Sequence, residues 1–148
     1  MPAFITFGRI LFAVLFIFSG ASKLLNLPAT AQMTEKIVIP AALATYTSQL
    51  EGVTGMATPQ MLAIAAGALE LICGIMIALN FGARFFAILL ILFVAAATFY
   101  YHDFWNQTGA DATGNLIHAL KNLSLIGALF MIAGYGRGPR AAEPAYDV

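Results

Sequence analysis

Four long apolar segments dominate this sequence and leave the chain few ways to fold. They run from about Phe4 to Leu25, from Pro59 to Leu79, from Phe85 to Tyr101 and from Asn115 to Gly134. A membrane-spanning helix needs roughly 20 mostly apolar residues, and a backbone inside hydrocarbon must satisfy its own hydrogen bonds. We therefore predict an all-α fold, an integral membrane four-helix bundle that forms a single domain over residues 1–148, with a disordered tail at residues 137–148.

The composition agrees with the bilayer as the solvent of this chain. Charged residues make up 9% of it and apolar residues 61%, whereas soluble domains carry about 25% charged residues. Seven basic residues balance seven acidic ones, which argues against a nucleic-acid partner. The single cysteine, Cys73, excludes an internal disulfide framework and a Cys-rich metal site, and we predict no metal site.

The connections between the apolar segments differ in length and character. Residues 80–83 form a turn short enough to require an antiparallel hairpin. The first loop, residues 26–58, holds a predicted interfacial helix from Ala29 to Ile39 that Pro40 ends. The loop before the last segment, residues 102–114, contains no basic residue except histidine.

The distribution of lysine and arginine predicts the orientation in the membrane. With four spans, both termini lie on one side, which holds four basic residues against two on the other: Arg9, Arg84, Arg137 and Arg140 against Lys23 and Lys36. We expect a multi-pass protein of the inner (plasma) membrane with cytoplasmic termini. Alternatively, the first segment is a signal peptide cleaved near Ser19 and Ala21, although it lacks a basic amino-terminal region.

Glu70 is the most informative polar residue, because it interrupts the second apolar segment. It lies about 16 Å along that helix at 1.5 Å per residue, near the membrane midplane, where a charge costs at least about 2.5 kcal/mol. Ala63, Gly67, Glu70 and Gly74 share one helical face. Small residues on this face allow close approach of a second helix, so we expect Glu70 to point into the bundle.

Polar side chains recur at helical spacing in the other three segments. We expect them to gather around Glu70 in a polar pocket in the outer half of the bundle, and the candidate residues are Lys23, Glu70, His102, Trp105, His118, Lys121 and Asn122. Two lysines and two carboxylates, with Asp103 as the second acid, would neutralise each other there. The alternatives are a purely structural ion pair at Glu70 and lysines that extend to the membrane surface.

The aromatic residues between Phe99 and Trp105 also have two interpretations. Tyrosine and tryptophan line bilayer interfaces, and the same side chains are suited to form the wall of a pocket for a planar ring such as a quinone head group. The two histidines, His102 and His118, are alternatively axial haem ligands from adjacent helices.

Four stretches resemble the DoxX family of small bacterial and archaeal four-helix membrane proteins. They are Gly8–Leu24 (GRILFAVLFIFSGASKL), Gly67–Arg84 (GALELICGIMIALNFGAR), Phe99–Trp105 (FYYHDFW) and His118–Phe130 (HALKNLSLIGALF). The resemblance covers the chain from Gly8 to about Gly136. It implies that the family's polar positions correspond here to Arg9, Lys23, Glu70, His102, Trp105, Lys121 and Asn122.

The resemblance also implies a role, because the family is named for a membrane subunit associated with a thiosulfate:quinone oxidoreductase. We expect an accessory subunit of a membrane redox complex, with quinone as the candidate cofactor and with other membrane proteins as partners, rather than an autonomous enzyme. Two alternatives remain: a non-catalytic scaffold whose small-residue faces (Gly67, Gly74, Gly127) are interfaces, and a solute or proton pathway with Glu70 as the carrier.

Overall fold

The computed structural model of the protein describes residues 3–135, and the regular secondary structure in that range consists of helices alone. They are α1 (Ala3–Leu25), α2 (Leu27–Thr34), α3 (Ala41–Thr54), α4 (Thr58–Ala78), α5 (Ala83–Tyr101), the short 3₁₀ helix η1 (Phe104–Asn106) and α6 (Gly109–Tyr135). The predicted disordered tail lies outside the described residues. Helices α1, α4, α5 and α6 are long and apolar enough to cross a membrane, which confirms the predicted all-α architecture with four spans.

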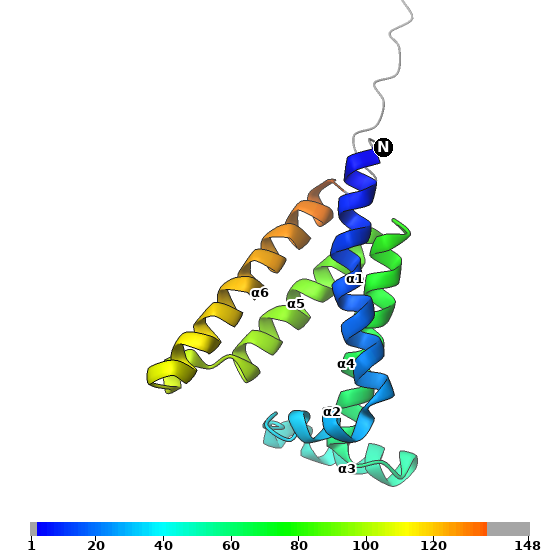
Figure 1. The fold of residues 1–148 in the computed structure, drawn as a ribbon. Coiled ribbons are helices and arrows are strands. Elements are labelled where there is room, and N and C mark those ends of the chain that lie inside the picture. The colour runs from blue at the N-terminus through cyan, green and yellow to red at the C-terminus, as the bar shows by residue number, and fades with distance from the viewer. Residues whose placement is uncertain (1–2, 136–148) are drawn as a thin grey trace, which may run out of the picture.

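The four spans form two pairs that make the arms of a V (Figure 1). Helix α1 packs along α4 in one arm, and α5 packs along α6 in the other. The arms converge where α1 begins and α6 ends, and they diverge toward α2 and α3, which lie across the open end of the first arm (Figure 1). The start of α1 and the end of α6 therefore lie on the same side, as a four-span chain requires.

Glycines set the close packing of the first arm. A Cβ added to Gly20 would lie 2.5 Å from the backbone nitrogen of Leu71 and 2.6 Å from the carbonyl oxygen of Gly67. Gly67 and Gly74 are buried in the same contact, against Leu24 and Ile17 of α1. Small residues let two backbones approach, which supplies the van der Waals contact that holds helices together in lipid.

The arms are joined by a tight turn between α4 and α5, as the sequence predicts. Asn80 and Gly82 both adopt left-handed backbone conformations, with φ of 58° and 56°, and asparagine and glycine are the residues that tolerate this region best. Next to the turn the arms share a core that includes Ile77, Leu90 and Leu129, all fully buried. Packing at the convergent end therefore holds the V together.

Two helical boundaries differ from the prediction. The first loop forms two helices in place of one from Ala29 to Ile39, and Pro40 precedes the second of them instead of ending the first. Helix α6 begins at Gly109, six residues before the predicted Asn115. Hydropathy marks only the part of a helix that is apolar, whereas the first turns of α6 are polar, and Asp111 there is favourable beside the positive end of the helix dipole.

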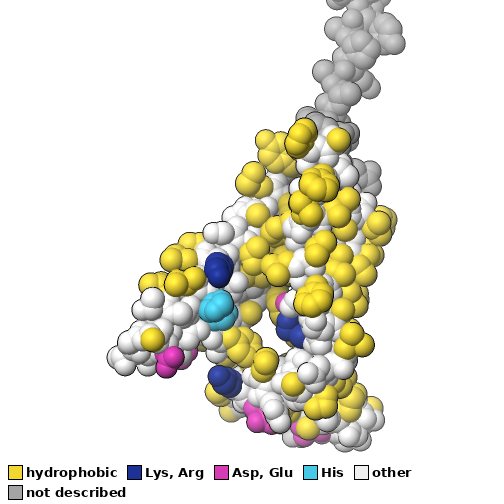
Figure 2. Space-filling view, viewed as in Figure 1, with side chains coloured by type: hydrophobic (Ala, Val, Ile, Leu, Met, Phe, Trp, Pro, Cys, Tyr) yellow, Lys and Arg dark blue, Asp and Glu magenta, His cyan; other side chains and the backbone are white. Residues whose placement is uncertain are grey.

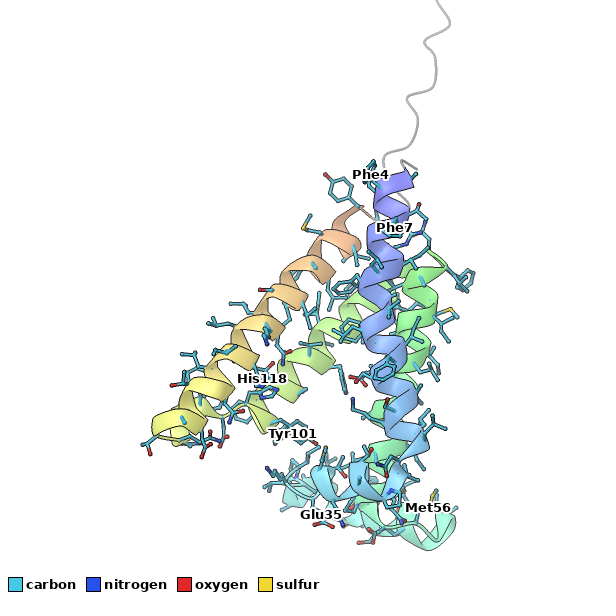
Figure 3. All side chains as sticks on the ribbon, in the orientation of Figure 1. Phe4, Phe7, Glu35, Met56, Tyr101 and His118 are labelled. Atoms are coloured by element: carbon cyan, nitrogen blue, oxygen red, sulfur yellow. The ribbon has the colours of Figure 1, made fainter. Side chains whose placement is uncertain are left out.

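The surface also differs between the convergent end and the open end of the V. Hydrophobic side chains cover the convergent end and the length of α1, whereas charged side chains and a histidine gather toward the open end, around the hollow between the arms (Figure 2). Phe4 and Phe7, 89% and 62% exposed, mark the apolar end, and Glu35, Tyr101 and His118 lie at the opposite end (Figure 3). Exposed apolar residues on spanning helices are those that face lipid.

Glu51 connects the end of α3 to the start of α4. Its Oε1 accepts hydrogen bonds from the Thr58 backbone N–H at 2.7 Å and from the Thr58 hydroxyl at 2.6 Å. These bonds, the hydroxyl's first, lower the pKa of Glu51 below its ordinary value. A carboxylate with a lowered pKa stabilises the fold above its unfolded-state pKa, and this contribution is lost as the pH falls through the folded-state pKa.

We expect Glu51→Ala to increase amide hydrogen exchange at Thr58 several-fold, because the first turn of α4 loses its acceptor. Gln49→Ala, at an exposed position of the same helix, is the matched control and is expected to leave this exchange unchanged. After correction for intrinsic exchange, the wild type should lose protection at Thr58 on acidification and the Glu51→Ala variant should not. Equal protection of the Thr58 amide in Glu51→Ala and Gln49→Ala would contradict the role of Glu51.

Candidate functional site

A buried ion pair lies between the two helices of the first arm. The Nζ of Lys23 donates to Oε2 of Glu70 at 2.6 Å and to Oγ of Ser19 at 2.6 Å, and the Ser19 hydroxyl donates to the same Oε2 at 3.0 Å. Glu70 is only 5% exposed, and the Lys23 side chain is 30% exposed. The expectation that Glu70 points inward, toward a basic partner, is thus met by the geometry.

The local sequence explains this arrangement. Ser19 and Lys23 are four residues apart on α1, so they lie on one face. Helices α1 and α4 run antiparallel, and Gly20 meets the α4 backbone at Gly67 and Leu71, on either side of Glu70, while Lys23 lies one turn further along α1. Because the two backbones touch there, short reaches of both side chains are enough to join them.

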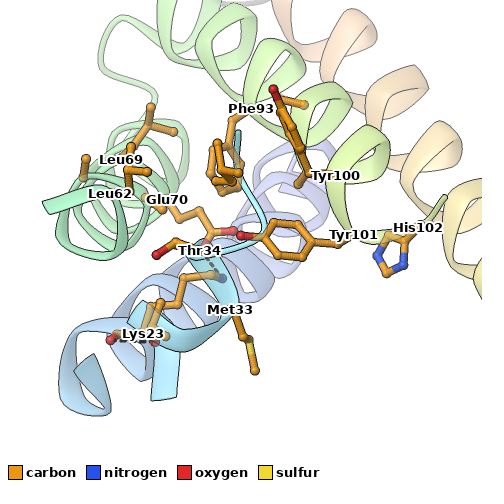
Figure 4. A pocket seen from close by; sticks show the side chains of 16 residues that line it. Lys23, Met33, Thr34, Leu62, Leu69, Glu70, Phe93, Tyr100, Tyr101 and His102 are labelled. Atoms are coloured by element: carbon orange, nitrogen blue, oxygen red, sulfur yellow. Dashed lines mark hydrogen bonds and ion pairs between the residues drawn. The ribbon is translucent and has the colours of Figure 1, made fainter. Parts of the chain in front are cut away.

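Beside the ion pair, a pocket of about 520 Å³ opens between α2, α4 and α5. This is within the range of small-molecule sites in proteins. Most of its lining is apolar, and the ion pair supplies its polar corner. Residues that contribute to its wall include Met33, Leu62, Leu69, Phe93, Tyr100 and Tyr101, together with Lys23, Glu70 and His102 (Figure 4).

Helix α2 closes one side of the pocket and is fastened by two buried threonines. The Thr34 hydroxyl donates to the Pro59 carbonyl oxygen at 2.7 Å, which ties α2 to the first turn of α4. The Thr30 hydroxyl donates to the carbonyl oxygen of Lys23 at 3.1 Å. Both threonines line the pocket, so the same residues that fix α2 also shape the site.

The pocket retains polar atoms that the protein itself does not satisfy. Within the described residues, Oε1 of Glu70 and the hydroxyl of Tyr101 make no hydrogen bond, although both residues line the pocket. Lys23 has three N–H donors and uses two of them. Figure 4 shows the Tyr101 ring extending from α5 toward the side of the pocket where Glu70 lies. The polar corner therefore offers donors and an acceptor to a ligand.

A second polar group of side chains lies at the edge of the pocket, where α5 gives way to η1 and α6. Nδ1 of His102 and Oδ1 of Asn115 are 3.0 Å apart, and Asn115 donates to Gln107, which donates to Asp103. The rings of His102 and His118 stack, with centroids 5.1 Å apart and an interplanar angle of 17°. Axial haem ligands direct nitrogen atoms at the iron, whereas these rings present their faces to each other, so this geometry does not support the haem-ligand alternative.

The structure brings together only part of the predicted polar cluster. Of the candidate residues, Lys23, Glu70 and His102 line the pocket, and Trp105, His118, Lys121 and Asn122 do not. Trp105 packs against Phe99 and Phe104, and Asn122 donates to the Thr98 hydroxyl at 2.9 Å.

Only half of the predicted mutual neutralisation of two lysines and two carboxylates is found in the described part of the chain: Lys23 pairs with Glu70, but Lys121 and Asp103 take no part. Among the described residues Lys121 forms no ion pair and is exposed on α6, and Asp103 accepts from Gln107 instead. The reason is the V: α6 belongs to the arm that diverges from Lys23 and Glu70 (Figure 1).

Several residues of the site are absent from the sequence-based prediction. The missing contributions come from α2 (Thr30, Met33, Thr34) and from the amides Gln107 and Asn115. The sequence predicts a helix in this loop (Ala29–Ile39) that overlaps α2, but no pattern indicates that it packs against the pocket. Asn115 and His118 are spaced so that both lie on one face of a helix. This spacing is the only sequence signal for the polar group at the edge of the pocket.

Two comparisons with known proteins bear on this site. A sequence model of the family described as DoxX matches residues 4–103, which cover α1 to α5 and contain Lys23, Glu70 and His102. The "Inner membrane protein YphA" of Escherichia coli (strain K12) is 30% identical over 138 residues, which cover 93% of this chain and 86% of that protein. No solved structure matches the chain significantly.

Proposed function

This chain belongs to the DoxX family of membrane proteins, and from that premise we propose that it is an integral subunit of a redox complex in the inner membrane and binds a quinone in its pocket. The observation that carries the proposal is the position of the Lys23–Glu70 pair. It forms the polar corner of a pocket that is otherwise mostly apolar.

A quinone matches this distribution of polarity. Its ring is planar and apolar on both faces, and its oxygens are concentrated at the edge. Aromatic side chains such as Phe93 and Tyr100 suit the faces of a ring. The third N–H of Lys23 is available to donate to a quinone carbonyl oxygen, and Oε1 of Glu70 is available to accept from the hydroxyl of the reduced form.

Glu70 also has the position of a proton-transfer group. It is the deepest carboxylate of the described spans. If Glu70 took the proton of a ligand hydroxyl, the carboxyl group would become neutral, and the Lys23 ammonium would stabilise the oxyanion left on the ligand. The redox chemistry would belong to the bound quinone and to partner subunits, while this chain binds and orients the ring. With the termini on the cytoplasmic side, the pocket would open in the outer half of the membrane.

The experiment is a titration of the purified full-length protein in nanodiscs with a short-chain benzoquinone, with the melting temperature as the readout. We expect a saturable increase of several degrees, and no increase with an alkylbenzene that has the same ring substituents but no carbonyl oxygens. Equal increases with both compounds, or no increase with the quinone, would contradict the proposal.

The second candidate function, a non-catalytic scaffold, is favoured by one observation. In the described chain α6 has a single buried residue, Leu129, and a Cβ added to Gly127 would meet nothing within 4 Å. That surface is available to another membrane protein, whereas Gly67 and Gly74, also predicted as interface residues, pack inside the first arm. An absent response to quinone would favour this function.

A further inference from the structure

The hydrogen bonds at the edge of the pocket form a chain in which the donor and the acceptor of each bond are fixed. The carboxylate of Asp103 accepts and does not donate, so Gln107 directs its amide nitrogen at Asp103, at 2.8 Å. The carbonyl oxygen of Gln107 then accepts from the amide nitrogen of Asn115, at 2.7 Å. The carbonyl oxygen of Asn115 is left to face His102, at 3.0 Å from Nδ1.

This direction determines which nitrogen of His102 carries the hydrogen. An amide oxygen only accepts, so Nδ1 of His102 must donate, and in the neutral ring Nε2 is then the acceptor. Among the described residues Nε2 makes no hydrogen bond, and His102 lines the pocket. The stacked ring of His118 limits rotation of the imidazole from the side of α6.

We propose that Asp103, Gln107 and Asn115 are positioning residues that fix His102 as the Nδ1–H tautomer, so that Nε2 accepts a hydrogen bond from a hydroxyl group of a ligand in the pocket. The ligand half of this inference rests on the proposed function and specifies it further: the reduced, hydroxyl-bearing form of the ring compound is the form that His102 recognises. The tautomer itself is a property of the protein alone.

The chain has two histidines, so selective ¹⁵N-histidine labelling of the full-length protein gives a spectrum with four ring nitrogens. His118→Phe, which keeps a planar ring in the stack, assigns the signals. At about pH 8.5, two units above the ordinary histidine pKa of about 6.5, we expect His102 to have a protonated Nδ1 and an unprotonated Nε2. Asn115→Leu should convert it mainly to the Nε2–H form, which histidine side chains prefer in water.

Gln107→Leu is the second variant, because it leaves Asn115 in place and removes only its orientation. A partial change of tautomer is expected from it. Asn106→Leu, at an exposed position of η1 without a side-chain hydrogen bond among the described residues, is the matched control and should leave the wild-type tautomer. An Nε2–H tautomer in the wild type, or Nδ1–H retained in both Asn115→Leu and Gln107→Leu, would overturn the inference.

The ligand half has its own readout. Adding a short-chain benzoquinol should move the Nε2 signal of His102, and the corresponding quinone should move it at least several-fold less. If the quinone raises the melting temperature but the quinol leaves Nε2 unmoved, the role of His102 is wrong and the proposed function stands. If neither compound binds, the proposed function and the ligand half fail together, and the tautomer is judged on the variants alone.

Discussion

Lys23→Met is expected to destabilise the protein by about 3 kcal/mol, the cost of removing one partner from a buried ion pair. The variant leaves Glu70, 5% exposed, with the Ser19 hydroxyl as its only remaining partner among the described residues. Methionine has a similar length and flexibility, so the loss of charge dominates over the loss of packing. Unfolding in mixed micelles with increasing SDS measures the effect.

The two members of the pair are not equivalent, which gives an internal control. Glu70→Met leaves Lys23 unpaired, but its side chain is 30% exposed, so its ammonium group can reach water. Glu70→Met should therefore lower the free energy of unfolding less than Lys23→Met does. The double variant should be more stable than Lys23→Met, because no charge is left uncompensated. Additive effects of the two substitutions would show that the pair does not couple.

Gly20→Ala is the second substitution with a large expected effect, about 1–3 kcal/mol by overpacking. The added methyl group would lie 2.5 Å from the Leu71 nitrogen and 2.6 Å from the Gly67 oxygen. Both are backbone atoms of a helix, so neither can rotate away, and α1 and α4 must separate. The same separation would lengthen the Lys23–Glu70 contact, because Gly20 meets α4 at Gly67 and Leu71, on either side of Glu70.

Gly8→Ala is the matched control on the same helix, since a Cβ at Gly8 meets nothing within 4 Å. It should be neutral or slightly stabilising, because alanine favours the helix over glycine. The readout is the same unfolding titration, together with quinone binding, which should weaken in Gly20→Ala and persist in Gly8→Ala. Equal stability of the two variants would mean that the helices of the first arm are not in close contact.

The sequence predicts the spans and the inward face of α4 well, because each depends on a regular pattern. Apolar length marks the four helices, and the spacing of Gly67, Glu70 and Gly74 identifies a face that the structure buries. That Glu70 needs a basic partner follows from the cost of a lone charge in lipid, although the sequence does not show which lysine it is. These inferences require no knowledge of how the helices are tilted.

The parts that could not be predicted depend on tilt and on irregular segments. Lys121 is a charged residue in an apolar segment, spaced so that it shares a face with His118, but it lies on the diverging arm. No local sequence pattern encodes the angle between α1 and α6. Helix α2, which supplies Thr30 and Thr34, overlaps the helix predicted from Ala29 to Ile39, but its packing against the pocket leaves no pattern in the sequence. The orientation of Gln107 and Asn115 depends on a chain of hydrogen bonds that links the end of α5, the η1 segment and α6. Sequence spacing alone does not reveal this chain.

The most direct test is the affinity for a short-chain benzoquinone of the wild type and of the Lys23→Met/Glu70→Met double variant, measured by calorimetry in nanodiscs. The double variant keeps the pocket walls and removes only the polar corner. We predict saturable binding to the wild type and at least about tenfold weaker binding to the double variant, which corresponds to about 1.4 kcal/mol. Equal affinities would show that Lys23 and Glu70 play no part in recognising the head group and would contradict the assignment of this pocket.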